Sequence, residues 1–171
     1  MKLKTEIFIA KVVTAAIVIL TLLMATRAHA GEIADLFKRY NKKLSEQQAL
    51  QFEAIVEEAG KHFGISPSLI AAIIVVESSA RPNAISKGGD YGLMQVRWKV
   101  HNKDYPQLKS HKDLLEPRNN IFIGTEIYAR YYAKKKSTAL ALKRYSGGSR
   151  KTARKVLNVL RELNFKEANY D

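Results

Sequence analysis

The sequence contains no cysteine among its 171 residues. This absence excludes disulfide bonds, thiolate metal sites, a cysteine nucleophile and a lipid-modified N-terminal cysteine. Stability therefore has to come from a hydrophobic core. With 46% apolar residues, a chain of this length is expected to form one globular domain.

The short motifs of metal and nucleotide sites are also missing. The four histidines show no His-Glu-x-x-His spacing, and neither Gly-x-x-x-x-Gly-Lys nor Gly-x-Gly-x-x-Gly occurs in the chain. We therefore expect no metal and no cofactor.

Acidic residues are scarce, because 16 Asp and Glu stand against 29 Lys and Arg and leave a formal net charge of +13. The imbalance is strongest in residues 130–171, which hold 12 basic and 3 acidic side chains. A solvated face of a basic C-terminal helix is the simpler interpretation of this segment, and attraction to a polyanion is the alternative.

Residues 1–30 have the pattern of a secretory signal peptide. Lys2 and Lys4 precede an apolar stretch from Val12 to Ala25, and Ala28-His29-Ala30 offers a small-x-small cleavage site. The apolar stretch is shorter than the roughly 20 residues that cross a bilayer. We therefore expect cleavage and export to the periplasm, with retention as a membrane anchor as the alternative.

Residues 31–171 are expected to form a single helical domain. Apolar residues recur at helical spacing in two successive segments. These residues are Ile33, Leu36, Phe37, Tyr40 and Leu44 in the first segment, and Phe52, Ile55, Val56, Ala59 and Phe63 in the second. Ser45 with Gln48 predicts a capping box at the start of the second helix, and Gly64 predicts its end.

A third helix is predicted to begin at Ser66-Pro67, since proline is well tolerated at the first helical position. Residues 69–76 are all apolar, so this helix should be buried on every side. The β-branched run over residues 73–76 also fits a buried strand, but the proline start and the helical neighbours favour a helix.

Residues 80–118 hold three of the four prolines and three of the nine glycines. They predict a long irregular segment, which is usually functional in a compact domain. Helical spacing resumes from Ile121 to Tyr131, from Thr138 to Arg144 and from Ala153 to Leu163. The sequence therefore predicts an all-α domain of about six helices.

Glu77 directly follows the apolar run at the end of the third helix. Burial against the core would raise the pKa of this carboxyl group above its ordinary value, which suits a general acid. The alternative is that Glu77 caps a chain end or pairs with a nearby arginine such as Arg81. Its position along the chain does not decide between these roles.

Four motifs follow one another within residues 63–148. They are Glu77-Ser78, Gly92-Leu93-Met94-Gln95, Asn120-Ile121 with Gly124-Thr125, and Arg144-Tyr145-Ser146-Gly147-Gly148. In this order and spacing they resemble the soluble lytic transglycosylase family of bacterial cell-wall enzymes. The resemblance implies a lysozyme-like helical fold in which the irregular segment forms one wall of the cleft.

The resemblance implies that Glu77 is the catalytic acid and base, and that substrate-binding positions lie around it. These positions are Ser86, Gly92, Met94, Gln95 and Tyr145. Ser86 would bind the sugar or its N-acetyl group, Gln95 its amide or hydroxyl groups, and the Tyr145 hydroxyl would orient Glu77. Gly92 would let the turn approach the substrate, with Met94 packed beneath the cleft. Arg144 and Ser146 depart from the alanine and asparagine usual in the family.

A second catalytic carboxylate is not evident. Asp90 is the best candidate, but an aspartate beside glycines is more often a turn former. Goose-type lysozyme, which resembles the same motifs, usually has an aspartate at the place of Arg97. Two-carboxylate hydrolysis therefore lacks a clear base.

The expected activity is that of a lytic transglycosylase. It cleaves the β-1,4 bond between N-acetylmuramic acid and N-acetylglucosamine in peptidoglycan and forms a 1,6-anhydro end. The alternatives are a hydrolytic muramidase and a catalytically silent peptidoglycan-binding module. Glycan strands are the expected partner, together with a secretion, conjugation or pilus apparatus by analogy with small family members. No nucleic acid is expected, and a membrane only if residues 1–30 are retained.

Overall fold

The fold was analysed in a computed structural model, which describes Lys11, Thr14 and residues 31–167, with side chains described up to residue 163. The predicted signal peptide or membrane anchor at residues 1–30 lies almost wholly outside the described residues. Within the described part of the chain, no helix is both long enough and apolar enough to cross a membrane.

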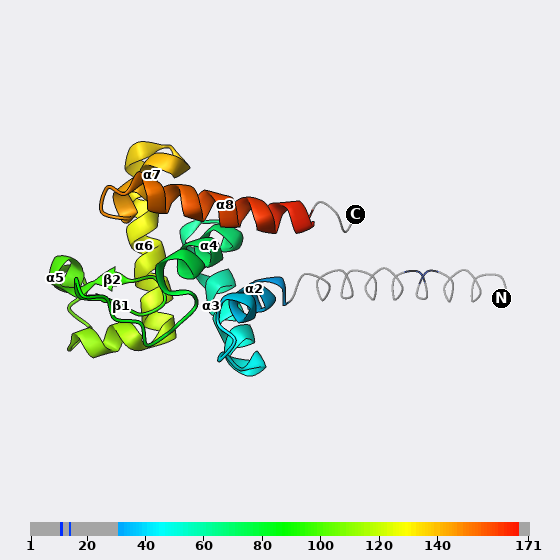
Figure 1. The fold of residues 1–171 in the computed structure, drawn as a ribbon, viewed down its shortest axis with the longest axis horizontal. Helices are drawn as coiled ribbons and strands as arrows, with labels where there is room; N and C mark the ends of the chain where they lie inside the picture. The colour runs from blue at the N-terminus through cyan, green and yellow to red at the C-terminus, as the bar shows by residue number, and fades with distance from the viewer. Residues whose placement is uncertain (1–10, 12–13, 15–30, 168–171) are drawn as a thin grey trace. The chain divides into compact units, whose positions relative to one another are not determined.

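The described residues form seven α-helices and one small hairpin, which confirms the predicted all-α class (Figure 1). The helices are α2 (Glu32–Tyr40), α3 (Glu46–Phe63), α4 (Pro67–Ser78), α5 (Trp98–His101), α6 (Pro117–Lys135), α7 (Thr138–Tyr145) and α8 (Arg150–Glu167). The hairpin pairs β1 (Asp90–Tyr91) with β2 (Val96–Arg97) in antiparallel register.

The predicted helix boundaries hold for α3 and α4. Ser45 and Gln48 form the predicted capping box, and Gly64 ends α3 in the left-handed conformation with φ 66°. Pro67 opens α4. The first helix is shorter than predicted: it ends at Tyr40, and Leu44 lies in the turn that follows. In this turn the Asn41 side chain accepts a hydrogen bond from the Lys43 backbone N–H.

Helix α4 lies at the centre of the packing. It contacts α3 on one side and α8 on another, and all seven residues from Leu69 to Val75 are buried. The predicted helix that is buried on every side is therefore confirmed. Helix α6 packs against both α3 and α7.

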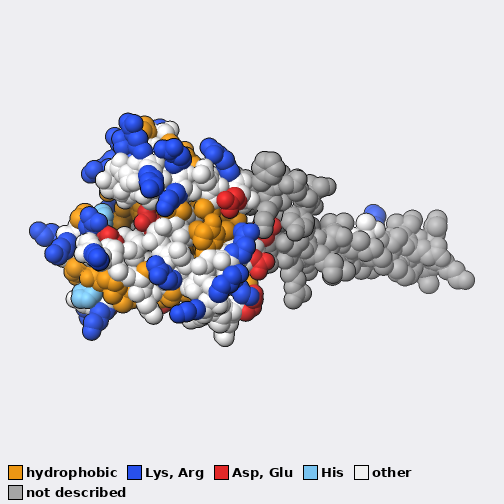
Figure 2. Space-filling view, viewed as in Figure 1, with side chains coloured by type: hydrophobic (Ala, Val, Ile, Leu, Met, Phe, Trp, Pro, Cys, Tyr) orange, Lys and Arg blue, Asp and Glu red, His pale blue; other side chains and the backbone are white. Residues whose placement is uncertain are grey.

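Helix α8 turns its apolar residues Ala153, Val156 and Val159 into the core, while Lys151 and Arg154 are exposed. This is the solvated basic face that the sequence favoured. Figure 2 shows Lys and Arg side chains over much of the visible surface, including the region of α7, and few acidic ones.

The segment between α4 and α6 is more regular than predicted. Besides the hairpin and α5, it contains two 3₁₀ helices, at Asn102–Asp104 and His111–Leu115. Pro117 was expected to lie in the irregular segment but instead starts α6, at the first helical position where proline is tolerated.

Asn120 fastens this segment to α6. Its side chain is fully buried, its Oδ1 accepts a hydrogen bond from the Met94 backbone at 2.7 Å, and its Nδ2 donates to the carbonyls of Tyr91 and Leu114, each at 2.7 Å. The turn between β1 and β2 is therefore held at both its ends by one amide.

We expect Asn120→Ala to lower the free energy of unfolding by about 3 kcal/mol, because it removes the partner of two buried backbone groups and of one half-buried backbone carbonyl. Urea unfolding measures this loss. Asn119→Ala is the matched control on the same helix, since Asn119 makes a single side-chain hydrogen bond, to the Asp113 carbonyl, and is half-buried. Equal losses in the two variants would contradict the role assigned to Asn120.

Candidate active site

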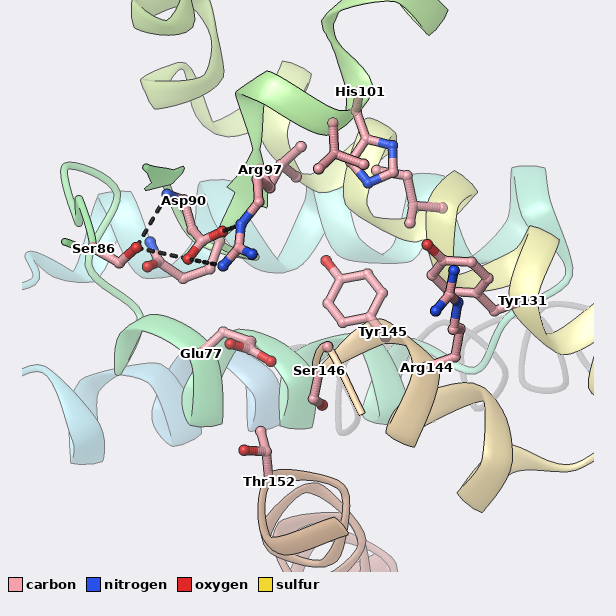
Figure 3. Close-up of a pocket in the computed structure, with 15 residues that line it drawn as sticks. Glu77, Ser86, Asp90, Arg97, His101, Tyr131, Arg144, Tyr145, Ser146 and Thr152 are labelled. Atoms are coloured by element: carbon pink, nitrogen blue, oxygen red, sulfur yellow. Dashed lines mark hydrogen bonds and ion pairs between the residues drawn. The ribbon is translucent and has the colours of Figure 1, made fainter. Parts of the chain in front are cut away.

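A pocket of about 440 Å³ opens where the end of α4, the hairpin, α5, α6 and the α7–α8 connection meet. Apolar side chains of Val96, Val100 and Ile127 form part of its lining, and the rest is largely polar. Of the residues predicted for the site, the structure brings Glu77, Ser86, Gln95 and Tyr145 together around this pocket (Figure 3). The segment between α4 and α6 provides one of its walls.

Glu77 is the last residue but one of α4, and its side chain is half-buried. The helix stops at once because Ser79 and Ala80 both take the left-handed conformation, each with φ 54°, which is a strained arrangement for residues other than glycine. The Glu77 carboxyl group thereby stays at the pocket instead of entering a further helical turn.

No hydrogen bond to the Glu77 carboxyl group is found among the described residues. Burial, and next the negative charge of Asp90, raise the pKa of Glu77 from its ordinary value of 4.5 to about 7. The alternative partner, Arg81, donates its Nε to the Ser78 carbonyl at 2.8 Å. Glu77 therefore forms no ion pair within the described part of the chain, and it keeps its proton up to neutral pH.

Asp90 also lines the pocket, but unlike Glu77 it has hydrogen-bonding partners that stabilise its ionised form. Arg97 donates Nε to Asp90 Oδ1 at 2.6 Å and a second N–H to Oδ2 at 3.0 Å, and the Ser86 hydroxyl donates to Oδ2 at 2.6 Å. Burial alone would raise the pKa of Asp90, but these hydrogen bonds and the charge of Arg97 outweigh it and lower the pKa. Asp90 is thus held as a paired carboxylate.

Ser86 lines the pocket, but its hydroxyl group is fully engaged. Its proton goes to Asp90, and its oxygen accepts the backbone N–H groups of Gly88 and Asp90, each at 3.1 Å. A hydroxyl group has one proton and two lone pairs. In this arrangement Ser86 positions Asp90 and has no hydrogen-bonding capacity left for a ligand.

Gln95 presents an acceptor to the pocket. The Gln95 backbone takes the left-handed conformation, with φ 50°. Its side-chain Nε2 donates hydrogen bonds to the carbonyls of Gly92 at 2.9 Å and Ala84 at 3.1 Å. Both amide protons are therefore used, and Oε1 is the group available to a hydroxyl or N–H donor of a ligand.

Tyr145 departs from its expected role. Its hydroxyl group donates to the Met94 carbonyl at 2.9 Å, so the single proton is not directed to Glu77. Burial, and next the negative charge of Glu77, raise the pKa of Tyr145 well above its ordinary value. The tyrosine joins α7 to the turn of the hairpin, and that turn offers the carbonyl that a buried hydroxyl needs.

Gly92 and Met94, expected among the substrate-binding positions, do not line the pocket. Both are buried, and for Met94 this agrees with the expected packing beneath the cleft. A Cβ at Gly92 would lie 2.3 Å from Asn120 Nδ2, and its φ is +74°, so the glycine serves the contact with α6. Met94 packs against Gly124, where a Cβ would meet its Sδ at 2.6 Å. These residues support the pocket from behind.

Several lining residues were missed by the sequence analysis as parts of the site. They are His101, Tyr131, Arg144 and Thr152. Of these, only Arg144 was marked by the sequence, as a residue next to Tyr145 that differs from the alanine usual in the family. The other three lie outside the motifs. The described residues contain no group of three or more His, Asp or Glu side chains that could hold a metal ion.

The sequence matches known proteins over most of this helical unit. The family model described as "Transglycosylase SLT domain" matches residues 54–167. A curated protein of Citrobacter koseri, "Endo-type membrane-bound lytic murein transglycosylase A", is 37% identical over 92 residues, covering 50% of this chain and 45% of that protein. The chain thus matches less than half the length of this relative.

A similar solved structure is that of an inactive variant of lytic transglycosylase Slt from Pseudomonas aeruginosa. The TM-score is 0.52 and the identity 20%, over 64% of this chain and 22% of that chain. At this identity the likeness concerns the fold alone, and it confirms the expected lysozyme-like helical architecture.

The raised pKa of Glu77 predicts a pH-dependent cost to stability. Below about pH 4.5 the carboxyl group is protonated in both the folded and the unfolded state. Between pH 4.5 and 7 only the unfolded chain ionises, so the folded state loses up to about 3 kcal/mol by pH 8. Glu77→Gln should therefore gain stability relative to the wild type as the pH rises from 4 to 8.

Urea unfolding at several pH values measures this change. Glu57→Gln, at an exposed position on α3, is the control for removal of a carboxyl group outside the pocket. A stability difference between Glu77→Gln and the wild type that does not vary with pH would contradict the raised pKa.

Proposed function

The chain belongs to the transglycosylase SLT domain family, and from this premise we propose that it is a peptidoglycan lytic transglycosylase with Glu77 as its catalytic acid and base. The observation that carries the proposal is the pair of carboxyl groups in one pocket. Glu77 has no ion-pair partner among the described residues and a pKa of about 7, whereas Asp90 is held by Arg97 and Ser86.

Glu77 first donates its proton to the oxygen of the β-1,4 bond between N-acetylmuramic acid and N-acetylglucosamine. As that bond breaks, the N-acetyl carbonyl of the muramyl residue stabilises the positive charge that develops at C1. The Glu77 carboxylate then takes the proton of the muramyl C6 hydroxyl group, whose oxygen bonds to C1. The product has a 1,6-anhydro end, and Glu77 regains its proton without consuming water.

A hydrolytic muramidase would need a second carboxylate as a base or nucleophile. Asp90 is the nearest candidate in the pocket, but a carboxylate bonded to both nitrogens of an arginine fork is a weak base. The ion pair of Asp90 with Arg97 thus favours the anhydro product over hydrolysis. In lytic transglycosylase Slt from Pseudomonas aeruginosa a glutamate-to-glutamine variant is inactive, which agrees with an essential glutamate.

The substrate places the protein in the cell envelope, and the curated relative is described as membrane-bound. Residues 1–30 would deliver the chain there as a signal peptide. Local opening of the wall for an envelope-spanning apparatus is the use that we propose for a domain of this size.

Digestion of purified sacculi tests the activity. The wild type should release fragments with 1,6-anhydro ends, and Glu77→Gln should lower the rate by at least about 100-fold, because it removes the proton that is transferred. Glu57→Gln should digest at the wild-type rate. Reducing ends in place of anhydro ends would assign the chain as a muramidase, and equal rates for Glu77→Gln and the wild type would remove Glu77 from the mechanism.

The pH profile provides a second prediction. Because the reaction starts from protonated Glu77, kcat/KM should fall as the pH rises through 7, by about tenfold between pH 6 and pH 8. In Asp90→Asn the midpoint should move to lower pH, since a negative charge that opposes ionisation of Glu77 is gone. A rate that rises over this range would show that the ionised carboxylate starts the reaction.

A further inference from the structure

Two arginines line the pocket, and only one of them has an ion-pair partner among the described residues. Asp90 pairs with Arg97, and His101 lies 3.7 Å from Asp104. Burial lowers the pKa of His101 despite this neighbour, which disfavours a positive charge there. Arg144 lines the same pocket, and among the described residues it has no ion-pair partner.

Arg144 is held at the pocket by an aromatic ring. It lies in the last turn of α7, directly before Tyr145, and its Cζ is 5.6 Å from the centroid of the Tyr131 ring. Figure 3 shows the Arg144 side chain alongside Tyr131, with Tyr145 between this pair and the Ser86–Asp90–Arg97 cluster, and with Glu77 below that cluster in the same view.

Stacking of this kind orients a guanidinium group without using its N–H groups. No side-chain hydrogen bond of Arg144 is found within the described residues, so its planar fork is available to a ligand. Such a fork matches a carboxylate, which it binds through two parallel hydrogen bonds. The pocket therefore holds an oriented anion-binding group as well as its proton donor.

We propose that Arg144, stacked on Tyr131, binds a carboxylate on the muramyl substituent and so selects muramyl-containing glycans. This inference rests on the proposed function. In a peptidoglycan strand the N-acetylglucosamine residues are neutral, and the negative charge lies on the lactyl group of each muramyl residue or, where that group is amide-linked, on the attached peptide. Both sources present the same carboxylate chemistry to the arginine.

Steady-state kinetics on four soluble glycan preparations test the proposal. Two carry free carboxylates: strands stripped of peptide, with free lactyl groups, and strands that keep their peptides. The other two are the same preparations after methyl esterification. Arg144→Gln should raise KM for a free-carboxylate substrate by about tenfold, the range of a charge-assisted hydrogen bond, and leave kcat within about twofold.

Esterification should raise the KM of the wild type by a similar factor and leave the KM of Arg144→Gln unchanged. Arg154→Gln removes the same charge at an exposed position of α8 outside the pocket lining, and it should behave as the wild type. An effect confined to stripped strands identifies the lactyl carboxylate, and one confined to peptide-bearing strands identifies the peptide; either result supports the carboxylate site.

Equal KM values for Arg144→Gln and the wild type on both free-carboxylate substrates would overturn the proposal. So would a rise in KM for Arg144→Gln that is the same on esterified strands, because a merely structural role predicts it. Calorimetric measurement of glycan binding to Glu77→Gln separates a failure of the Arg144 proposal from a failure of the proposed function. If the wild type cleaves none of the substrates, the proposed function fails, while the change in Kd between Glu77→Gln and Glu77→Gln with Arg144→Gln still decides whether Arg144 binds a carboxylate.

Discussion

The apolar surface of α4 has to be covered on every side, and the arrangement of the domain follows from this requirement. Every residue from Leu69 to Val75 is buried, so the neighbouring helices α3 and α8 pack around it. The partly exposed residues of α4 lie at its two ends, and Glu77 lies at the C-terminal end. The cost of ionising Glu77 is therefore a direct consequence of the helix that carries it, because burial is the main cause of its raised pKa.

The pocket separates two carboxyl groups by their environments. Asp90 receives three hydrogen bonds from Arg97 and Ser86, whereas Glu77 receives none from the described residues. The first is stabilised as a carboxylate, and the negative charge it retains helps to keep the second protonated. Because the two pKa values are shifted in opposite directions, Glu77 holds the proton and Asp90 holds the negative charge.

Most residues of the sequence motifs hold the hairpin turn behind the pocket in place. Asn120 binds the backbone on both sides of the hairpin turn, Gly124 leaves room for Met94, and the Tyr145 hydroxyl bonds to the Met94 carbonyl. The motifs thus describe how the turn is fixed between α6 and α7. Glu77 and the acceptor of Gln95 face the pocket because this frame holds them there.

The sequence alone determined the helical class, the capping of α3, the proline start of α4 and the position of Glu77, because each depends on neighbouring residues or on the spacing of apolar ones. Only the tertiary structure decided that Ser86 has no free hydrogen-bonding group, that Gly92 lies behind the pocket, and that Arg144 meets Tyr131. Gly92 meets Asn120, and Arg144 meets Tyr131, across different elements of the fold. The partners of Ser86 are close in the chain, but the conformation of the loop before β1 decides that its hydroxyl group meets Asp90. The direction of a hydroxyl proton or a guanidinium group is set by partners that local spacing does not specify.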